Sequence, residues 1–308
     1  MKRLVVILGA VALLVSGCAK NRAVGVGPAD TPSPTPTHTK SSPQPSPSPS
    51  ARSTPTEPSP RPSDEPSPTG TVTYQLWFAG DDSQLYLVHR TEPATEAVGR
   101  ASLTALLEGP NAEEADAGVG TQIPPGTSLV DLSIVDGLAT VNLSNEYFSG
   151  GSAVSEWTRL GQVVDTIGQF RSVDAVNIEL EGDPIKTFDI DGRALDRPWK
   201  RGDFEQILPP IVVDEPSIGQ TVASPITVSG TANVFEATVS YRLLDEAGDE
   251  IASGFVTATC GTGCRGDYTK DVSFSVDHTQ PGTLEVFEES AENGQPVNVV
   301  TVPLTLEA

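Results

Sequence analysis

Histidine and cysteine are scarce in this chain of 308 residues, which contains only three of each. The histidines, His38, His89 and His278, are far apart in the sequence, and no histidine and cysteine have the spacing of a zinc site. No G-x-S-x-G segment is present to hold a nucleophilic serine. The sequence therefore indicates no metal site, no cofactor and no catalytic residue, and we expect a protein that is not an enzyme.

Basic residues are also few. The chain has 19 lysines and arginines against 41 acidic residues, which gives a formal net charge of −22. Such a charge repels the phosphates of nucleic acids and acidic lipid headgroups. We therefore expect no nucleic-acid partner. Apart from one run near the N-terminus, no apolar stretch approaches the ~20 residues that span a bilayer as a helix.

The N-terminus has the pattern of an export signal. Lys2 and Arg3 precede the short apolar run Leu4–Val15, which suits the hydrophobic part of a signal peptide. The run ends in Val15-Ser16-Gly17-Cys18, which resembles the lipobox of bacterial lipoproteins. In that family the signal peptide is cleaved before the cysteine, which then carries acyl chains that anchor the protein in the membrane. The resemblance implies that residues 1–17 are removed and that Cys18 is lipidated. The alternative is a plain secretory signal with an incidental cysteine.

Residues 18–70 are predicted to form a lipid-anchored linker. The stretch from Thr31 to Gly70 holds 13 of the chain's 27 prolines, many serines and threonines, and a single apolar residue, Ala51. Because so few apolar side chains cannot offset the entropy of ordering a chain, the sequence predicts disorder here. A spacer that lifts the folded part off the membrane and a tail without a specific role are both compatible with this composition. The expected location is the extracytoplasmic face of the cell membrane.

Residues 71–208 alternate between strand and helix patterns. Gly109-Pro110 is expected to end the first helix, and Asp136-Gly137 to make a tight hairpin turn. The order β-β-α-β-β-α-β predicts an α+β fold in which helices cover one face of a mostly antiparallel sheet. The predicted strands lie around 74–78, 84–90, 130–134, 139–143 and 176–180, and the predicted helices at 95–108 and 153–170.

Residues 209–308 show only strand patterns. Apolar and polar residues alternate in about seven short segments, for which an immunoglobulin-like β-sandwich is the economical fold. The clearest of these segments lie near 211–213, 226–230, 237–243, 272–276, 284–286 and 300–306.

Both regions resemble known families. The segments SLTALLEGP, IPPGTSLVDLSIVDGLATVNLS and GQVVDTIGQFRSVDAVNIELEG resemble the GerMN domain of sporulation and germination proteins, over most of residues 71–190. The segments SPITVSGTANVFEATVSYRLLDEAGDEIASG and FEESAENGQPVNVVTVPLTL are similar to the immunoglobulin-like domain of spore-germination proteins, over nearly all of 209–306. The first resemblance implies an extracytoplasmic domain without a known catalytic centre, similar to assembly modules of envelope complexes.

Cys260 and Cys264 remain once Cys18 is lipidated, and two cysteines in an exported protein usually pair. We expect a structural disulfide that clips a connection between strands. A redox pair is the alternative, although C-x-x-x-C lacks the C-x-x-C helix context that lowers a thiol pKa. The segment from Gly261 to Gly266 also matches G-x-G-x-x-G, but a dinucleotide loop needs a helix after it, and strands are predicted on both sides.

Two tryptophans, Trp77 and Trp199, are candidates for a docking surface. Trp77 lies on the opposite strand face from Leu76 and Phe78 and is expected to be half-exposed. Trp199 lies between the two regions, where it either packs them together or marks a docking patch. Trp157 falls on the apolar stripe of a helix and is expected in the core. His89, His278 and the acidic cluster Glu113, Glu114 and Asp116 are expected on the solvated surface.

These observations predict a non-enzymatic, lipid-anchored protein of the cell envelope. Its two folded regions would act as protein-interaction or assembly modules, linked to sporulation, germination or wall remodelling. The expected partners are the membrane, through acyl chains on Cys18, and other envelope proteins. The alternative is an accessory protein that binds peptidoglycan or another glycan, or that works with a wall hydrolase.

Overall fold

The computed structural model describes residues 70–80, 82–185 and 197–308, all of which belong to one compact unit. Cys18, His38 and the predicted linker lie outside these ranges. Within them, no helix is long and apolar enough to cross a membrane. We distinguish an α+β region, up to residue 208, from a β-rich region that begins at residue 209.

The α+β region has the predicted elements in the predicted order, with four short additions. The additions are α2, β6 and two 3₁₀ helices, η1 and η2. The elements are β1 (Thr71–Ala79), β2 (Leu85–Pro93), α1 (Val98–Glu108), α2 (Ala112–Asp116), β3 (Leu129–Val135), β4 (Leu138–Leu143), η1 (Asn145–Phe148), α3 (Ala153–Ile167), β5 (Ala175–Leu180), β6 (Asp183–Pro184) and η2 (Arg201–Ile207).

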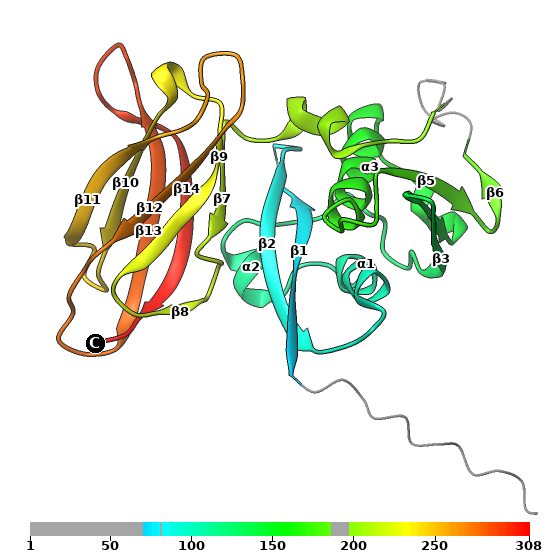
Figure 1. Cartoon of the computed structure of the whole chain (residues 1–308), viewed down its shortest axis with the longest axis horizontal. Coiled ribbons are helices and arrows are strands. Elements are labelled where there is room, and N and C mark those ends of the chain that lie inside the picture. Colours follow the sequence, from blue (N-terminus) through cyan, green and yellow to red (C-terminus); the bar gives the residue numbers. More distant parts are fainter. Residues whose placement is uncertain (1–69, 81, 186–196) are drawn as a thin grey trace, which may run out of the picture. The chain divides into compact units, whose positions relative to one another are not determined.

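The strands of this region form two sheets instead of the single sheet that was expected. β1 pairs with β2 as an antiparallel hairpin, and β3, β4, β5 and β6 form the second sheet in that order. β4 and β5 run parallel because α3 connects them, and a connection through a helix returns the chain to the same end of the sheet. Helices α1 and α3 pack against β1 and against each other (Figure 1). The core between these elements contains Leu76, Phe78, Leu103, Leu106, Val141, Val164 and Ile167.

The hairpin turn between β3 and β4 forms at the predicted residues. Asp136 and Gly137 have φ angles of 49° and 83°, so both central positions are left-handed. This is the conformation that a two-residue hairpin needs and that Asp-Gly favours. The carbonyl of Gly137 also accepts hydrogen bonds from the amides of Asp174 and Ala175, which ties the turn to the start of β5.

Helix α2 corrects the prediction of a solvated acidic loop. The side chain of Asn111 accepts a hydrogen bond from the Glu114 amide, and the Glu114 carboxylate accepts one from the Asn111 amide, which together form a capping box. Glu114 is buried and pairs with Arg90, whose Nε lies 3.0 Å from its carboxylate. Glu114 therefore stabilises the fold from inside, while its neighbour Glu113 is exposed.

The β-rich region is an immunoglobulin-like sandwich, as predicted. One sheet has the strand order β11-β10-β13-β14-β8 and the other the order β12-β9-β7, and buried residues of both sheets form a common core (Figure 1). The elements are β7 (Ile211–Glu215), β8 (Thr221–Val222), β9 (Ile226–Ala232), the 3₁₀ helix η3 (Phe235–Ala237), β10 (Thr238–Leu244), β11 (Glu250–Thr257), β12 (Gly266–Val272), β13 (Gln280–Glu289) and β14 (Pro296–Leu306).

One strand of the sandwich lies earlier in the chain than predicted. The strand expected at 272–276 ends at Val272 and begins at Gly266, where it pairs with β9. Tyr268 and Val272 face the core, but the polar residues between them hid the pattern. Phe274 is buried without being part of a strand, and its amide donates a hydrogen bond to Ser224 Oγ at 3.0 Å.

Candidate functional site

The two tryptophans predicted to form a docking surface are buried. Trp77 is 4% exposed and Trp199 is 9% exposed, so the expectation of a half-exposed Trp77 is wrong. Helix α3 lies along the edge of β1 that β2 leaves unpaired, where the Trp77 amide donates a hydrogen bond to Thr166 Oγ1 at 3.0 Å. The guanidinium of Arg201 lies 5.6 Å from the centre of the Trp77 ring. Trp77 is therefore unavailable as a docking surface.

Trp199 packs inside the α+β region. Its ring centre lies 5.3 Å from that of Trp157 and 5.9 Å from that of Phe204, and its backbone forms an isolated bridge with Val176. Trp157 is only half-buried, and not fully in the core as expected. These contacts favour neither alternative raised for Trp199, since the ring neither joins the two regions nor lies on an exposed patch.

The most elaborate polar arrangement lies where the two regions meet. There a cavity of about 580 Å³ is lined from both sides. The α+β region contributes Trp77 from β1, Asp165 from α3 and Arg201 from η2. The β-rich region contributes Asp214 from β7, Arg265 from the loop before β12, and Tyr268 from β12. We call this cavity the junction cleft.

Asp214 joins the two regions at the edge of the junction cleft. Its Oδ1 accepts a hydrogen bond from Gln75 Nε2 at 3.0 Å and lies 3.1 Å from His89 Nε2. The hydrogen bond from His89 lowers the pKa of the Asp214 carboxyl below its ordinary value, and the one from Gln75 acts in the same direction. His89, expected on the solvated surface, is instead largely covered, whereas His278 is exposed.

Asp165 is a buried acid on the inner side of α3. It is 2% exposed, and its Oδ1 has no hydrogen-bond partner among the described residues. The nearest cation is Arg201, whose Nε lies 4.0 Å from that oxygen, beyond hydrogen-bond distance. Burial raises the pKa of Asp165 to about 8, and Arg201 only partly opposes this. The carboxyl is therefore mostly protonated at neutral pH, and it can both donate and accept a hydrogen bond.

Arg265 enters the junction cleft from the β-rich region. Its Nη2 donates a hydrogen bond to the carbonyl of Pro209 at 2.8 Å, while its Nε is buried without a partner among the described residues. The hydroxyl of Tyr268 donates to the carbonyl of Val212 at 3.0 Å. Both side chains thus hold the segment that connects the two regions.

The wall of the junction cleft carries both hydrogen-bond donors and acceptors. In the described ranges, no three His, Cys, Asp or Glu side chains come together to hold a metal ion. Of these residues, only Trp77 was predicted to be part of a functional site. The other signal in the sequence is the row Thr158, Gln162 and Asp165, whose helical spacing places polar groups together on α3.

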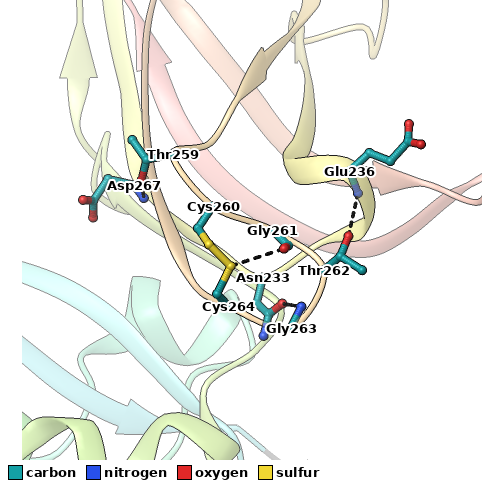
Figure 2. Close-up of a disulfide and its surroundings, with 9 residues drawn as sticks. All are labelled: Asn233, Glu236, Thr259, Cys260, Gly261, Thr262, Gly263, Cys264 and Asp267. Atoms are coloured by element: carbon teal, nitrogen blue, oxygen red, sulfur yellow. Dashed lines mark hydrogen bonds between the residues drawn. A yellow bond between two sulfur atoms is a disulfide. The ribbon is translucent and has the colours of Figure 1, made fainter.

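The predicted disulfide between Cys260 and Cys264 is present in the loop between β11 and β12 (Figure 2). The loop is held to the segment before β10, because the Gly263 amide donates to Asn233 Oδ1 and the Glu236 amide donates to Thr262 Oγ1, both at 3.0 Å. The glycine-rich segment therefore connects two strands, as predicted.

The outer edge of β3 is an exposed apolar surface. β3 is the edge strand of its sheet, and among the described residues no strand pairs with its outer side. Val130, Ile134 and Val135 are exposed, with 64% of Val135 in contact with solvent. Leu132, on the same strand face as Val130 and Ile134, is half-buried. Asp131 and Asp136 are both exposed here; Asp131 pairs with Arg100 of α1, whose Nη2 lies 2.7 Å from its Oδ1, so the negative charge of this edge comes mainly from Asp136.

Two families match the chain. Residues 75–186 match the family described as sporulation and spore germination, and residues 210–295 match the immunoglobulin-like domain of bacterial spore germination. Neither family is a known enzyme family. The chain matches no curated protein.

Several solved structures are similar to parts of the chain. The first GerMN domain of the sporulation protein GerM from Bacillus subtilis is 25% identical, with a TM-score of 0.37, over 43% of this chain and 99% of that domain. The tandem GerMN domains of the same protein are 17% identical, with a TM-score of 0.38, over 67% of this chain and 62% of theirs. A putative lipoprotein from Clostridium perfringens is 23% identical, with a TM-score of 0.32, over 45% of this chain and 93% of its own. These TM-scores are low, so the assignment of the two regions rests on the family matches.

Replacing Asp165 by asparagine is expected to stabilise the fold increasingly as the pH rises. The parent carboxyl stays protonated in the folded chain up to about pH 8 but ionises in the unfolded chain above its ordinary pKa of 3.8. The parent therefore loses stability between these two values, by up to about 1.4 kcal/mol per pH unit, and the variant does not. Urea unfolding at pH 5, 6, 7 and 8 measures the difference in the free energy of unfolding.

The control is Asp131→Asn, which removes an exposed carboxylate whose pKa is lowered, mainly by a backbone hydrogen bond from Leu132. Its effect on stability should stay constant between pH 5 and pH 8, because Asp131 is ionised in both the folded and the unfolded chain over that range. A constant or shrinking difference for Asp165→Asn over the same range contradicts the assignment of a buried, protonated carboxyl.

Proposed function

We propose that this chain, which carries a sporulation-and-germination domain of GerMN type followed by an immunoglobulin-like domain of the bacterial spore-germination type, is a non-enzymatic lipoprotein that docks other proteins at the outer face of the cell membrane. The observation that carries the proposal is the combination of these two domain types behind a lipobox-like cysteine. The descriptions of the two families support a role in sporulation or germination.

The anchor rests on the N-terminal sequence. Lys2 and Arg3, the short apolar run and Cys18 together match the pattern of a lipoprotein signal. The acidic body would be repelled by anionic lipids, so acyl chains on Cys18 supply the attraction to the bilayer. The proline-rich linker of residues 18–70 then gives the folded part reach from the membrane.

The surface that best fits a protein partner is the outer edge of β3. An edge strand offers backbone donors and acceptors to an incoming strand, and exposed apolar side chains beside it add contact area. Val130, Ile134 and Val135 supply such side chains. Asp136 makes the edge acidic, and a basic side chain can also compete with Arg100 for Asp131, so the occupant that fits is an extended segment of an envelope protein with apolar and basic side chains.

The lipid anchor has a direct test in the living cell. With Cys18→Ala, the protein should leave the membrane fraction and appear in the medium, or stay uncleaved, because there is no sulfur to acylate. The parent protein, without the substitution, should give an intact mass equal to that of residues 18–308 plus the acyl chains. A mass without acyl chains, or a parent protein that is already released, contradicts the anchor.

The docking edge is tested by photo-crosslinking in cells, with the crosslinking residue at position 134. The matched control is position 297, because Ile134 and Val297 are 37% and 38% exposed and lie in different regions. A discrete product is expected from position 134 and not from 297. It should weaken about threefold or more with Asp131→Asn and Asp136→Asn together, because each lost charge pair reduces affinity modestly.

Three outcomes contradict this assignment of the edge. The same products from positions 134 and 297 would show non-specific contact. A product of twice the chain's own mass would show a second copy at the edge. A product that does not respond to removal of the two carboxylates would exclude a basic partner segment.

A further inference from the structure

Three buried polar atoms without partners belong to residues of the junction cleft. They are Trp77 Nε1, Asp165 Oδ1 and Arg265 Nε, none of which has a hydrogen-bond partner among the described residues. Trp77 and Asp165 are themselves more than nine-tenths buried. An unpaired buried polar group costs about 1–3 kcal/mol, so native proteins rarely keep several in one place without a role for them. Their concentration around one cavity points to a ligand.

The wall of the junction cleft offers both donors and acceptors. Arg201 and Arg265 can only donate, while Asp214 accepts, and the protonated Asp165 does both. Hydroxyl groups of Ser229, Thr231 and Thr269 line the same cavity. Such a mixed wall suits a ligand whose own groups both donate and accept, as hydroxyls do.

The charges of the junction cleft argue against a charged ligand. Three carboxylates, those of Glu205, Asp214 and Asp267, nearly balance the two guanidinium groups of Arg201 and Arg265, so the wall has no strong excess of either charge to hold an ion. The volume of about 580 Å³ falls in the range of small-molecule sites. Apolar patches from Leu87, Leu208 and Val212 lie among the polar groups, which suits the alternating polar rim and apolar face of a sugar ring.

We propose that the junction cleft binds an uncharged saccharide of about two rings, held by Trp77, Asp165 and Arg265. Arg201 covers the approach to Trp77 and Asp165, because its half-exposed side chain lies over the Trp77 ring and 4.0 Å from the Asp165 carboxyl. A sugar hydroxyl that displaces this side chain gains Asp165 Oδ1 as an acceptor and Trp77 Nε1 as a donor. This site is separate from the edge of β3, and it does not depend on the proposed docking function.

The test is a titration of the purified full-length chain with N,N′-diacetylchitobiose, an uncharged disaccharide, in which isothermal titration calorimetry measures the heat of binding. Saturable binding with a dissociation constant below about 5 mM is expected, a weak affinity typical of few hydrogen bonds in a wet cleft. Trp77→Phe and Arg265→Gln should each weaken binding about fivefold or more, because each removes one hydrogen-bond donor. Asp165→Asn should weaken it less, since an amide still donates and accepts.

The matched controls are Trp157→Phe and Arg242→Gln. Both carry the same chemical change outside the junction cleft and should leave binding within about twofold of the parent. Thermal unfolding of each variant shows whether it is folded, and a variant that does not fold is replaced by Thr231→Val, which changes only a hydroxyl on the wall.

Each remaining outcome overturns the proposal. An absence of saturable heat up to 10 mM disaccharide, a concentration chosen to exceed the expected constant about twofold, means that water alone occupies the cleft. Equal weakening in the cleft and control variants places the sugar elsewhere. Binding of inorganic phosphate or spermidine, used as charged probes, with no binding of the disaccharide assigns the cleft to an ion.

Discussion

Strand β7 packs against both domains, with alternate side chains in the two hydrophobic cores, and the contact between the domains depends on it. Ile211 and Val213 point into the core of the β-rich region, while Val212 belongs to the core of the α+β region. Asp214 continues this second face and receives the hydrogen bond from Gln75. Side chains on a strand alternate between its faces, so a run of five residues packs against two cores at once. The two domains are joined by packing as well as by the chain, and the junction cleft exists because of this.

The fold could be predicted from the sequence where apolar residues recur with the period of a helix or a strand. The apolar stripe of α3 and the alternation in β4 and β10 have such a period, although α3 is buried on almost every side and β3 has no fully buried residue. The turn residues Asp136-Gly137 fix the register between β3 and β4. The position of strand β12 was predicted wrongly because polar residues separate its buried residues and a glycine-rich loop lies next to it. Helix α2 was not predicted because five residues are too few to show a helical period, and only its capping box indicates a helix.

The candidate site could be predicted far less well, for a physical reason. Asp165, Asp214 and Arg265 come from a helix, a strand and a loop that are distant in the chain, and apart from the polar row on α3 that includes Asp165, nothing local distinguishes them from the other charged residues. His89 is largely covered, and its partner Asp214 comes from the other domain. Trp77 was recognised as a special residue, but its exposure was misjudged, because its side chain is buried against residues distant in the chain, Arg201 among them.

The central claim is that β7 and Asp214 hold the two domains as one body. The measurement that tests it most directly is backbone ¹⁵N relaxation of the full-length chain, compared between residues 70–208 and 209–308. The account predicts a single rotational correlation time for both sets of amides, and a clear separation of the two values in Asp214→Ala with Gln75→Ala. Two different correlation times in the unmodified chain would contradict the account, since neither the shared strand nor the cleft beside it would then persist in solution.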